Sequence, residues 1–160
     1  MPLSAMGIFH TLVGLIAIFT AAQQIWTHKQ ILAETRSGKV YLIATALTAL
    51  SALTIFKHGG FNTAHALAIL TLAATFAGVV LEATKWFGGW NKYLRNICYT
   101  GTLLFHALPT ATEILTRFPM DAPVVSSLQD PLLQKVFLVI LIVWLIGLIS
   151  QLVWLKFKAK

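Results

Sequence analysis

Apolar and polar positions alternate along this chain in long blocks. Five apolar segments cover about residues 3–27, 40–56, 61–81, 96–115 and 132–155, and the charged residues gather between them. Each segment has about the 17 to 25 residues that a helix needs to cross a hydrocarbon layer of about 30 Å. Helices are expected because backbone groups in lipid must bond within their own segment. The pattern predicts an all-α membrane protein with a single integral membrane domain over residues 1–160.

Within four of these segments, small and polar residues recur every three or four positions, which places them on one helical face. Small residues let helices approach closely, and hydroxyl groups bond between helices in lipid. The four faces predict an antiparallel four-helix transmembrane bundle, with the uniformly apolar segment 132–155 as a peripheral fifth transmembrane helix. The residues of these faces are His10, Gly14, Ala17, Ala21, Gln24 and His28; Tyr41, Thr45, Thr48, Ser51 and His58; His65, Ala68, Thr71, Thr75, Gly78 and Glu82; and Tyr99, Thr102, His106, Thr110 and Glu113.

Composition and charge indicate the environment and the orientation. The chain is 58% hydrophobic and 11% charged, whereas soluble domains average about 25% charged residues. Nine Lys and Arg residues fall at one end of the five segments and three at the other, so the positive-inside rule predicts a cytoplasmic C-terminus and an N-terminus outside. The net charge of +7 then reflects topology. We expect the lipid bilayer, and not nucleic acid, to be the partner of the basic residues.

Four histidines and one carboxylate carry the candidate chemistry. At about 1.5 Å per helical residue, His10, His58 and His65 fall in the outer half of the predicted bundle and His106 falls near mid-membrane. Neutral imidazole is a good ligand of iron, copper and zinc. We therefore predict a polar pocket in which His10, His65 and His106 bind a redox cofactor, either b-type haem or a quinone. A bare transition-metal ion would instead take His10, His58, His65 and Glu113.

Two other functions are open on the same residues. His106 and Glu113 are ionisable groups within a predicted span, and such groups are typical of proton or small-solute conduction, with Thr102 and Thr110 as hydroxyl steps. Alternatively, the histidines only satisfy hydrogen bonds in an accessory subunit of a larger membrane complex, or in a homo-oligomer. No GxSxG, HExxH or Walker motif occurs, so no enzyme class is assigned.

One stretch of the chain resembles a family of small multi-pass bacterial membrane proteins of unknown function. The stretch is SGKVYLIATALTALSALTIFKHGGFNTAHALAILTL, and the likeness rests on the four residues Gly38, Lys39, Val40 and Tyr41 and on later helices that carry His65 and His106. It covers roughly residues 36–118. The resemblance implies a location in the bacterial inner membrane and implies no particular activity.

Overall fold

The computed structural model describes residues 4–56 and 60–158, and all regular structure in these ranges is helical. The helices are α1 (Ala5–His28), α2 (Arg36–Ala52), α3 (Thr63–Ala83), the short 3-10 helix η1 (Gly88–Trp90), α4 (Asn91–Arg117) and α5 (Pro131–Lys158). The predicted all-α class is therefore confirmed, and each predicted segment contains one long helix. The second helix begins four residues before the predicted segment at residue 40 and ends at Ala52, four residues before its end.

Three of the five helices, α1, α3 and α5, are long and apolar enough to cross a membrane. Helix α2 has 17 residues, which gives a length of about 25 Å against a hydrocarbon layer of about 30 Å. Helix α4 has 27 residues but carries Lys92 and Arg95 near its start and Arg117 at its end. The length and composition of three helices therefore suit contact with a lipid bilayer.

Polar side chains cap the N-termini of three helices, where the first backbone N–H groups have no partner within the helix. The Ser4 side chain accepts from the Gly7 N–H of α1 and the Thr35 side chain accepts from the Gly38 N–H of α2. Asn62 is the N-cap residue just before α3, and its side chain accepts from the Ala64 N–H at 2.9 Å. These caps explain why the observed helices begin where they do, outside the most apolar residues.

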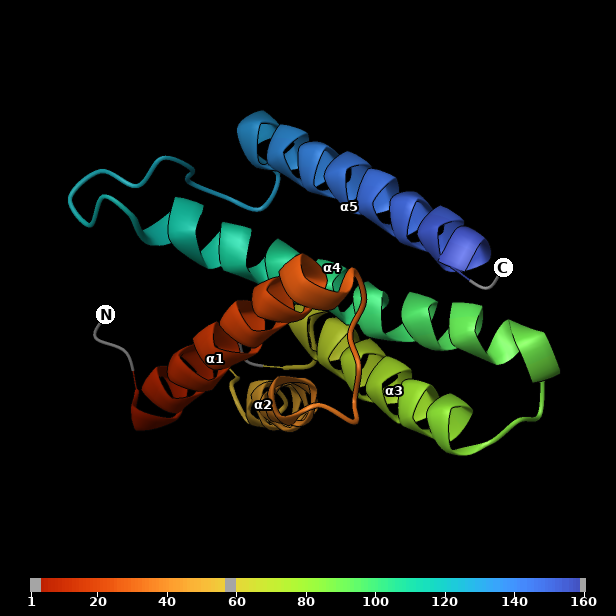
Figure 1. Ribbon diagram of the computed structural model, residues 1–160. Helices are drawn as coiled ribbons and strands as arrows, with labels where there is room; N and C mark the ends of the chain where they lie inside the picture. The colour runs from red at the N-terminus through yellow and green to blue at the C-terminus, as the bar shows by residue number, and fades with distance from the viewer. Residues whose placement is uncertain (1–3, 57–59, 159–160) are drawn as a thin grey trace.

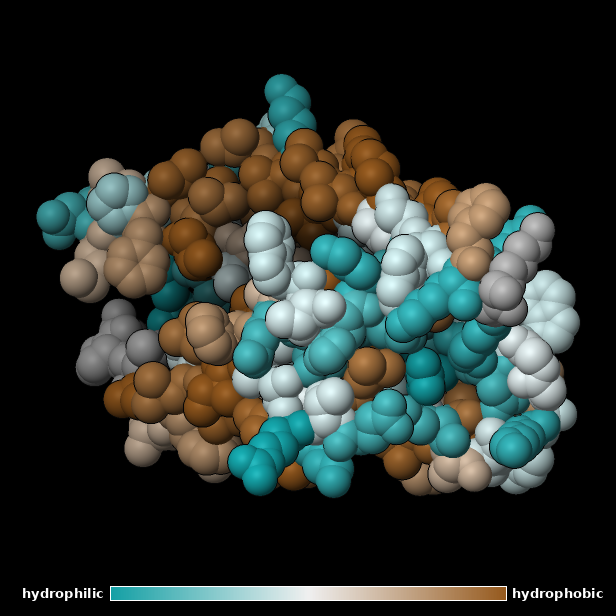
Figure 2. Space-filling view, viewed as in Figure 1, coloured by the Kyte–Doolittle hydropathy of each residue, from teal (hydrophilic) through white to brown (hydrophobic). Residues whose placement is uncertain are grey.

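Helices that follow one another in the chain pack against one another, α1 on α2, α2 on α3, α3 on α4 and α4 on α5. Figure 1 shows α5 lying alongside α4, while α2 is seen almost along its axis. In Figure 1, α2 points toward the viewer, whereas α4 and α5 run across the picture. Figure 2 shows hydrophobic residues over α5, at the top, and hydrophilic residues where α1 ends and α2 begins.

The faces predicted to turn inward are buried over most of their length. The buried members are Ala17, Ala21, Gln24, Tyr41, Thr45, Thr48, Ser51, His65, Ala68, Thr71, Thr75, Gly78, Tyr99, Thr102 and His106. The prediction is confirmed for these residues. It is wrong for Glu113, whose side chain is 51% exposed, because this carboxylate pairs with Arg117 one helical turn later on the outer surface of α4.

Two glycines permit the closest approaches in the fold. A Cβ on Gly78 would lie 2.3 Å from Cε1 of the fully buried Tyr99 ring, so α3 and α4 meet there. A Cβ on Gly38 would lie 1.8 Å from the carbonyl oxygen of Leu32. The α1–α2 loop therefore folds directly onto the first turn of α2, and only glycine leaves room for it.

Candidate functional site

His10 of α1 contacts the last turn of α2. Its Nδ1 lies 3.0 Å from the Thr48 carbonyl oxygen and 3.0 Å from Ser51 Oγ. A carbonyl oxygen only accepts, and the Ser51 hydroxyl already donates to the same Thr48 carbonyl at 2.8 Å. Nδ1 is therefore the protonated nitrogen of neutral His10.

His106 of α4 reaches the same face of α2. Its Nε2 lies 3.3 Å from Thr45 Oγ1, and the residue is 9% exposed. Both imidazoles therefore contact α2, His10 at Thr48 and Ser51 and His106 at Thr45, one helical turn before Thr48. We call His10, Thr45, Thr48, Ser51 and His106 the histidine cluster; the structure brings together two of the three predicted cofactor ligands.

His65 stands apart from this cluster. It is 2% exposed, and its Nδ1 accepts a hydrogen bond from the Asn62 N–H at 3.3 Å, which completes the cap of α3. Its ring stacks on Phe56 at 4.7 Å between centroids and lies 5.5 Å from the Phe61 ring. Its Nε2 is buried and has no hydrogen-bond partner among residues 4–56 and 60–158. His65 therefore has one nitrogen used by the fold and one without a partner.

The four predicted metal ligands are only partly described. His58 lies outside the described residues. Among the residues that the structure describes, no three His, Cys, Asp or Glu side chains are grouped closely enough to hold a metal ion. Glu113 is engaged by Arg117, with Nε 2.5 Å from Oε2. The described part of the chain thus offers pairs of candidate ligands and no larger set.

Helix packing occupies the small residues on the faces of His10 and His65. A Cβ on Gly14 would lie 3.5 Å from Cγ2 of Thr48, so Gly14 already faces a side chain of α2. Ala68, on the face of His65, is 5% exposed. As they stand, the described residues do not fit a macrocycle between His10 and His65.

A second polar cluster lies at the other end of α4 and was not predicted as a site. Arg95 Nη1 donates to Glu82 Oε1 at 3.2 Å and Arg95 Nη2 donates to Gln30 Oε1 at 3.1 Å. The Tyr99 hydroxyl donates to Glu82 Oε2 at 2.9 Å. We call Gln30, Glu82, Arg95 and Tyr99 the glutamate cluster. Glu82 and Tyr99 were on predicted inward faces, whereas Arg95 was counted only among the basic residues that set topology and Gln30 was given no role.

A cavity that opens at the protein surface adjoins the glutamate cluster. It has a volume of about 310 Å³ and is lined by Glu82 and Arg95 together with Lys85 and Lys92. Several waters fit this volume, since each takes about 30 Å³ in the liquid. The side chains of Arg95 and Glu82 keep 18% and 23% of their area exposed.

Buried tyrosines lie between the two clusters. The Tyr41 hydroxyl bonds to Thr102 Oγ1, and Thr102 in turn donates to the Tyr99 carbonyl at 2.7 Å. Thr45, which belongs to the histidine cluster, lies one helical turn from Tyr41 on α2 and is also buried. Tyr99 therefore belongs to the glutamate cluster through its hydroxyl and contacts Tyr41 and Thr102 through its carbonyl oxygen. Both tyrosines are 0% exposed.

Comparison with protein-family models, curated proteins and solved structures finds no match to this chain. The resemblance to a family of small multi-pass membrane proteins is therefore carried by the four residues from Gly38 to Tyr41 and the later histidines. The structure gives two of the four a role in folding. Gly38 admits the Leu32 carbonyl, and Tyr41 provides a buried hydroxyl between α2 and α4.

Proposed function

We propose that this chain is a multi-pass inner-membrane protein that transfers protons between its two polar clusters. In this proposal all five helices cross the bilayer, the first four surround the clusters, α5 lies at the periphery, and the N-terminus faces outward. The three long apolar helices and the hydrophilic region seen in Figure 2 support this arrangement. The short α2 would have to lie almost along the bilayer normal, or the bilayer would thin around it.

One observation carries the function: buried ionisable and hydroxyl groups follow one another through the protein interior. Along α4, the side chains of His106, Thr102, Tyr99 and Arg95 all contact neighbouring helices or loops, and the first and last are 11 residues apart, or about 16 Å. This is about half of the hydrocarbon thickness of about 30 Å. Ionisable groups are costly at such depth and are retained mainly for ion or proton pathways.

Two steps of the proposed transfer use atoms that already contact one another, His106 with Thr45 and Tyr41 with Thr102. A proton entering at the histidine cluster is taken up at an imidazole nitrogen and passed from His106 Nε2 to Thr45 Oγ1, 3.3 Å away. Tyr41 and Thr102 continue the hydroxyl steps. Glu82 is the acceptor at the other end, with water in the adjoining cavity as the exit.

Tyr99 divides the pathway into two parts. A carbonyl oxygen does not pass a proton on, so the contact of Tyr41 with the Tyr99 carbonyl closes the route. For the pathway to open, the Tyr41 hydroxyl must break its hydrogen bond to the Tyr99 carbonyl. Losing one net hydrogen bond costs about 1 kcal/mol. The Tyr99 hydroxyl, already bonded to Glu82 at 2.9 Å, is the group that must then be reached through water or by side-chain rotation.

Proton flux into vesicles tests the proposal. The purified protein is reconstituted with a potassium gradient and valinomycin, and internal pH is followed with a trapped dye. We expect flux above that of empty vesicles and a loss of at least about tenfold in His106→Ala and in Glu82→Gln. His28→Ala is the matched control, because His28 ends α1 outside both clusters. Wild-type flux equal to that of empty vesicles, or unchanged flux in both cluster variants, would refute the proposal.

A redox cofactor or metal ion bound through His65 is the second candidate function. It is favoured by the buried Nε2 without a partner and by the aromatic rings on either side. An absorption spectrum and metal analysis of the purified protein test it, with His65→Ala and His10→Ala beside the His28→Ala control. A featureless spectrum together with metal-free protein would remove this candidate. If a stoichiometric membrane partner then co-purifies and no flux is seen, the accessory-subunit function is the one supported.

A further inference from the structure

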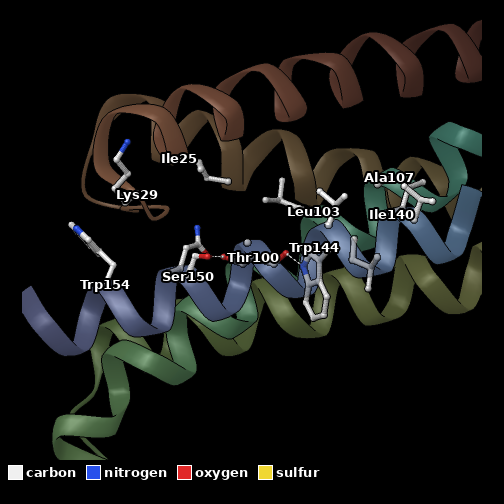
Figure 3. A pocket seen from close by; sticks show the side chains of 14 residues that line it. Ile25, Lys29, Thr100, Leu103, Ala107, Ile140, Trp144, Ser150 and Trp154 are labelled. Carbon is white, nitrogen blue, oxygen red and sulfur yellow. Dashed lines mark hydrogen bonds between the residues drawn. The ribbon is translucent and has the colours of Figure 1, made fainter.

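A long apolar groove runs between α5, α4 and the end of α1. Its volume is about 740 Å³, within the range of about 300 to 1,000 Å³ typical of small-molecule sites. Figure 3 shows Lys29 and Trp154 at one end and Ala107 and Ile140 at the other. Ile140 and Trp154 are 14 residues apart on α5, so the groove is about 21 Å long. None of the polar clusters described above contributes a residue to its lining.

The groove is polar at one end only. Between Ile140 and Trp144 its α5 wall is hydrocarbon or aromatic, whereas Ser150 and Gln151 line the part nearer Trp154. Gln151 Oε1 is already occupied, since Asn96 donates to it at 3.1 Å and Thr100 at 2.8 Å. The groove is therefore an apolar channel whose one end lies beside the polar side chains of Ser150 and Gln151.

The polar end is also positively charged. Lys29 is the one charged residue of the described lining, and its Nζ donates to the Trp26 carbonyl at 3.1 Å, which leaves two further N–H donors. Lys158 Nζ lies 4.7 Å from the Trp154 ring centroid, and Lys92 Nζ reaches the Leu155 carbonyl at 3.4 Å. The ammonium groups of Lys29 and Lys158 thus lie at this end of the groove, whose described lining holds no carboxylate, whereas Lys92 lines the cavity beside Glu82.

We infer that the groove holds one acyl chain of an anionic membrane phospholipid, with the phosphate of its headgroup beside Lys29. The length argues for such a chain, because one leaflet is about 15 Å deep and the groove exceeds this. The position of Trp154 and Lys158 suits the headgroup level, where aromatic and basic residues concentrate. The charge argues for an anionic lipid over a neutral one, since cations near anionic headgroups gain attraction that a zwitterionic lipid does not provide. This inference goes beyond the proposed proton transfer and does not depend on it.

Gly147 provides a direct test of occupancy. It lines the groove, and a Cβ added to it would meet nothing within 4 Å. A side chain at this position therefore begins in open space, so we expect Gly147→Leu to fill the channel, and it also replaces a poor helix former by a good one. Gly101 is the matched control, because it is also helical with nothing within 4 Å of an added Cβ, but it lies outside the groove lining.

The experiment is native mass spectrometry of the delipidated full chain in detergent, titrated with phosphatidylglycerol or phosphatidylcholine. We expect wild type to bind one phosphatidylglycerol at least about tenfold more tightly than phosphatidylcholine. Gly147→Leu should lower the affinity for phosphatidylglycerol by at least about tenfold, whereas Gly101→Leu should leave it unchanged. Equal binding by wild type and Gly147→Leu, or an equal loss in Gly101→Leu, would overturn the inference. Circular dichroism of each variant checks that the helices are intact.

Lys29→Gln tests the headgroup separately and keeps the inference falsifiable if Gly147→Leu does not fold. It should reduce the preference for phosphatidylglycerol over phosphatidylcholine several-fold, whereas the exposed Lys39→Gln should not. An unchanged preference overturns the assignment of the headgroup. Two further outcomes also overturn it: tighter binding of an isoprenoid quinone than of phosphatidylglycerol, or a dimer of this chain that occupies the groove and disappears in Gly147→Leu.

Discussion

Replacing Gly78 by alanine tests the contact on which the arrangement of α3 and α4 depends. The added Cβ would lie 2.3 Å from Cε1 of Tyr99, where ordinary van der Waals contact begins at 3.4 Å. The ring would therefore have to move by about 1.1 Å (3.4 minus 2.3). It cannot move freely, because Tyr99 is 0% exposed and its hydroxyl is bonded to Glu82 at 2.9 Å.

Two opposing contributions set the magnitude. Overpacking a buried site costs about 1 to 3 kcal/mol, and a displaced rigid ring belongs at the upper end. Alanine in place of glycine within a helix raises the free energy of unfolding by about 1 kcal/mol. We expect a net loss of about 2 kcal/mol, or a melting temperature lower by about 4 to 8 °C for a chain of this size. Gly101→Ala carries the same gain in helix propensity without a clash, since nothing lies within 4 Å of its added Cβ.

The assay is thermal unfolding in detergent, followed by tryptophan fluorescence. Because the propensity gain cancels between the two variants, their difference of about 3 kcal/mol isolates the steric cost at Tyr99. Gly78→Ala should melt below wild type and Gly101→Ala should melt above it. If both variants shift in the same direction by a similar amount, α3 and α4 do not meet at Tyr99 as described. The proposed proton pathway, which passes Tyr99, would then lose its structural basis.

Two further substitutions test how the loops and helix starts are held. Gln24→Leu removes a fully buried amide that donates to Thr35 Oγ1 at 2.9 Å and accepts from the Leu32 N–H at 3.0 Å. We expect the same unfolding assay to show a loss of about 2 kcal/mol, because a backbone donor is left unpaired. The exposed neighbour Gln23→Leu should change little, and equal effects of the two would contradict this role. Asn62→Ala should cost about 1 kcal/mol by removing the α3 cap, while Asn62→Ser should retain stability; equal melting of wild type and Asn62→Ala would show that the cap is dispensable.

Local pattern was sufficient for the helices and for most of their buried faces. Helical periodicity relates residues three or four positions apart, so Thr45, Thr48 and Ser51 could be assigned to one inward face without any knowledge of neighbours. The same reasoning failed at Glu113. A carboxylate near the end of a helix can meet a cation on its own helix, and Arg117 is one turn away.

The candidate sites depended on partners that periodicity does not identify. Arg95 bonds to Glu82 across 13 residues and to Gln30 across 65, and His10 meets Ser51 across 41. Such pairs form only when separate helices pack at a particular depth and rotation. Arg95 and Gln30 lie in segments whose charge and polarity suggested only a loop, so nothing local distinguished them from solvated residues.

The amino-acid sequence by itself determined the all-α class, the number of long helices and the inward position of residues such as Tyr41 and Tyr99, because these follow from local hydrogen bonding and from which face excludes polar groups. Only the tertiary structure decided that His10 and His106 share one face of α2, that His65 caps its own helix, and that α5 leaves an open groove. These features depend on the rotation and spacing of whole helices, which are set by close contacts such as that of Gly78 with Tyr99.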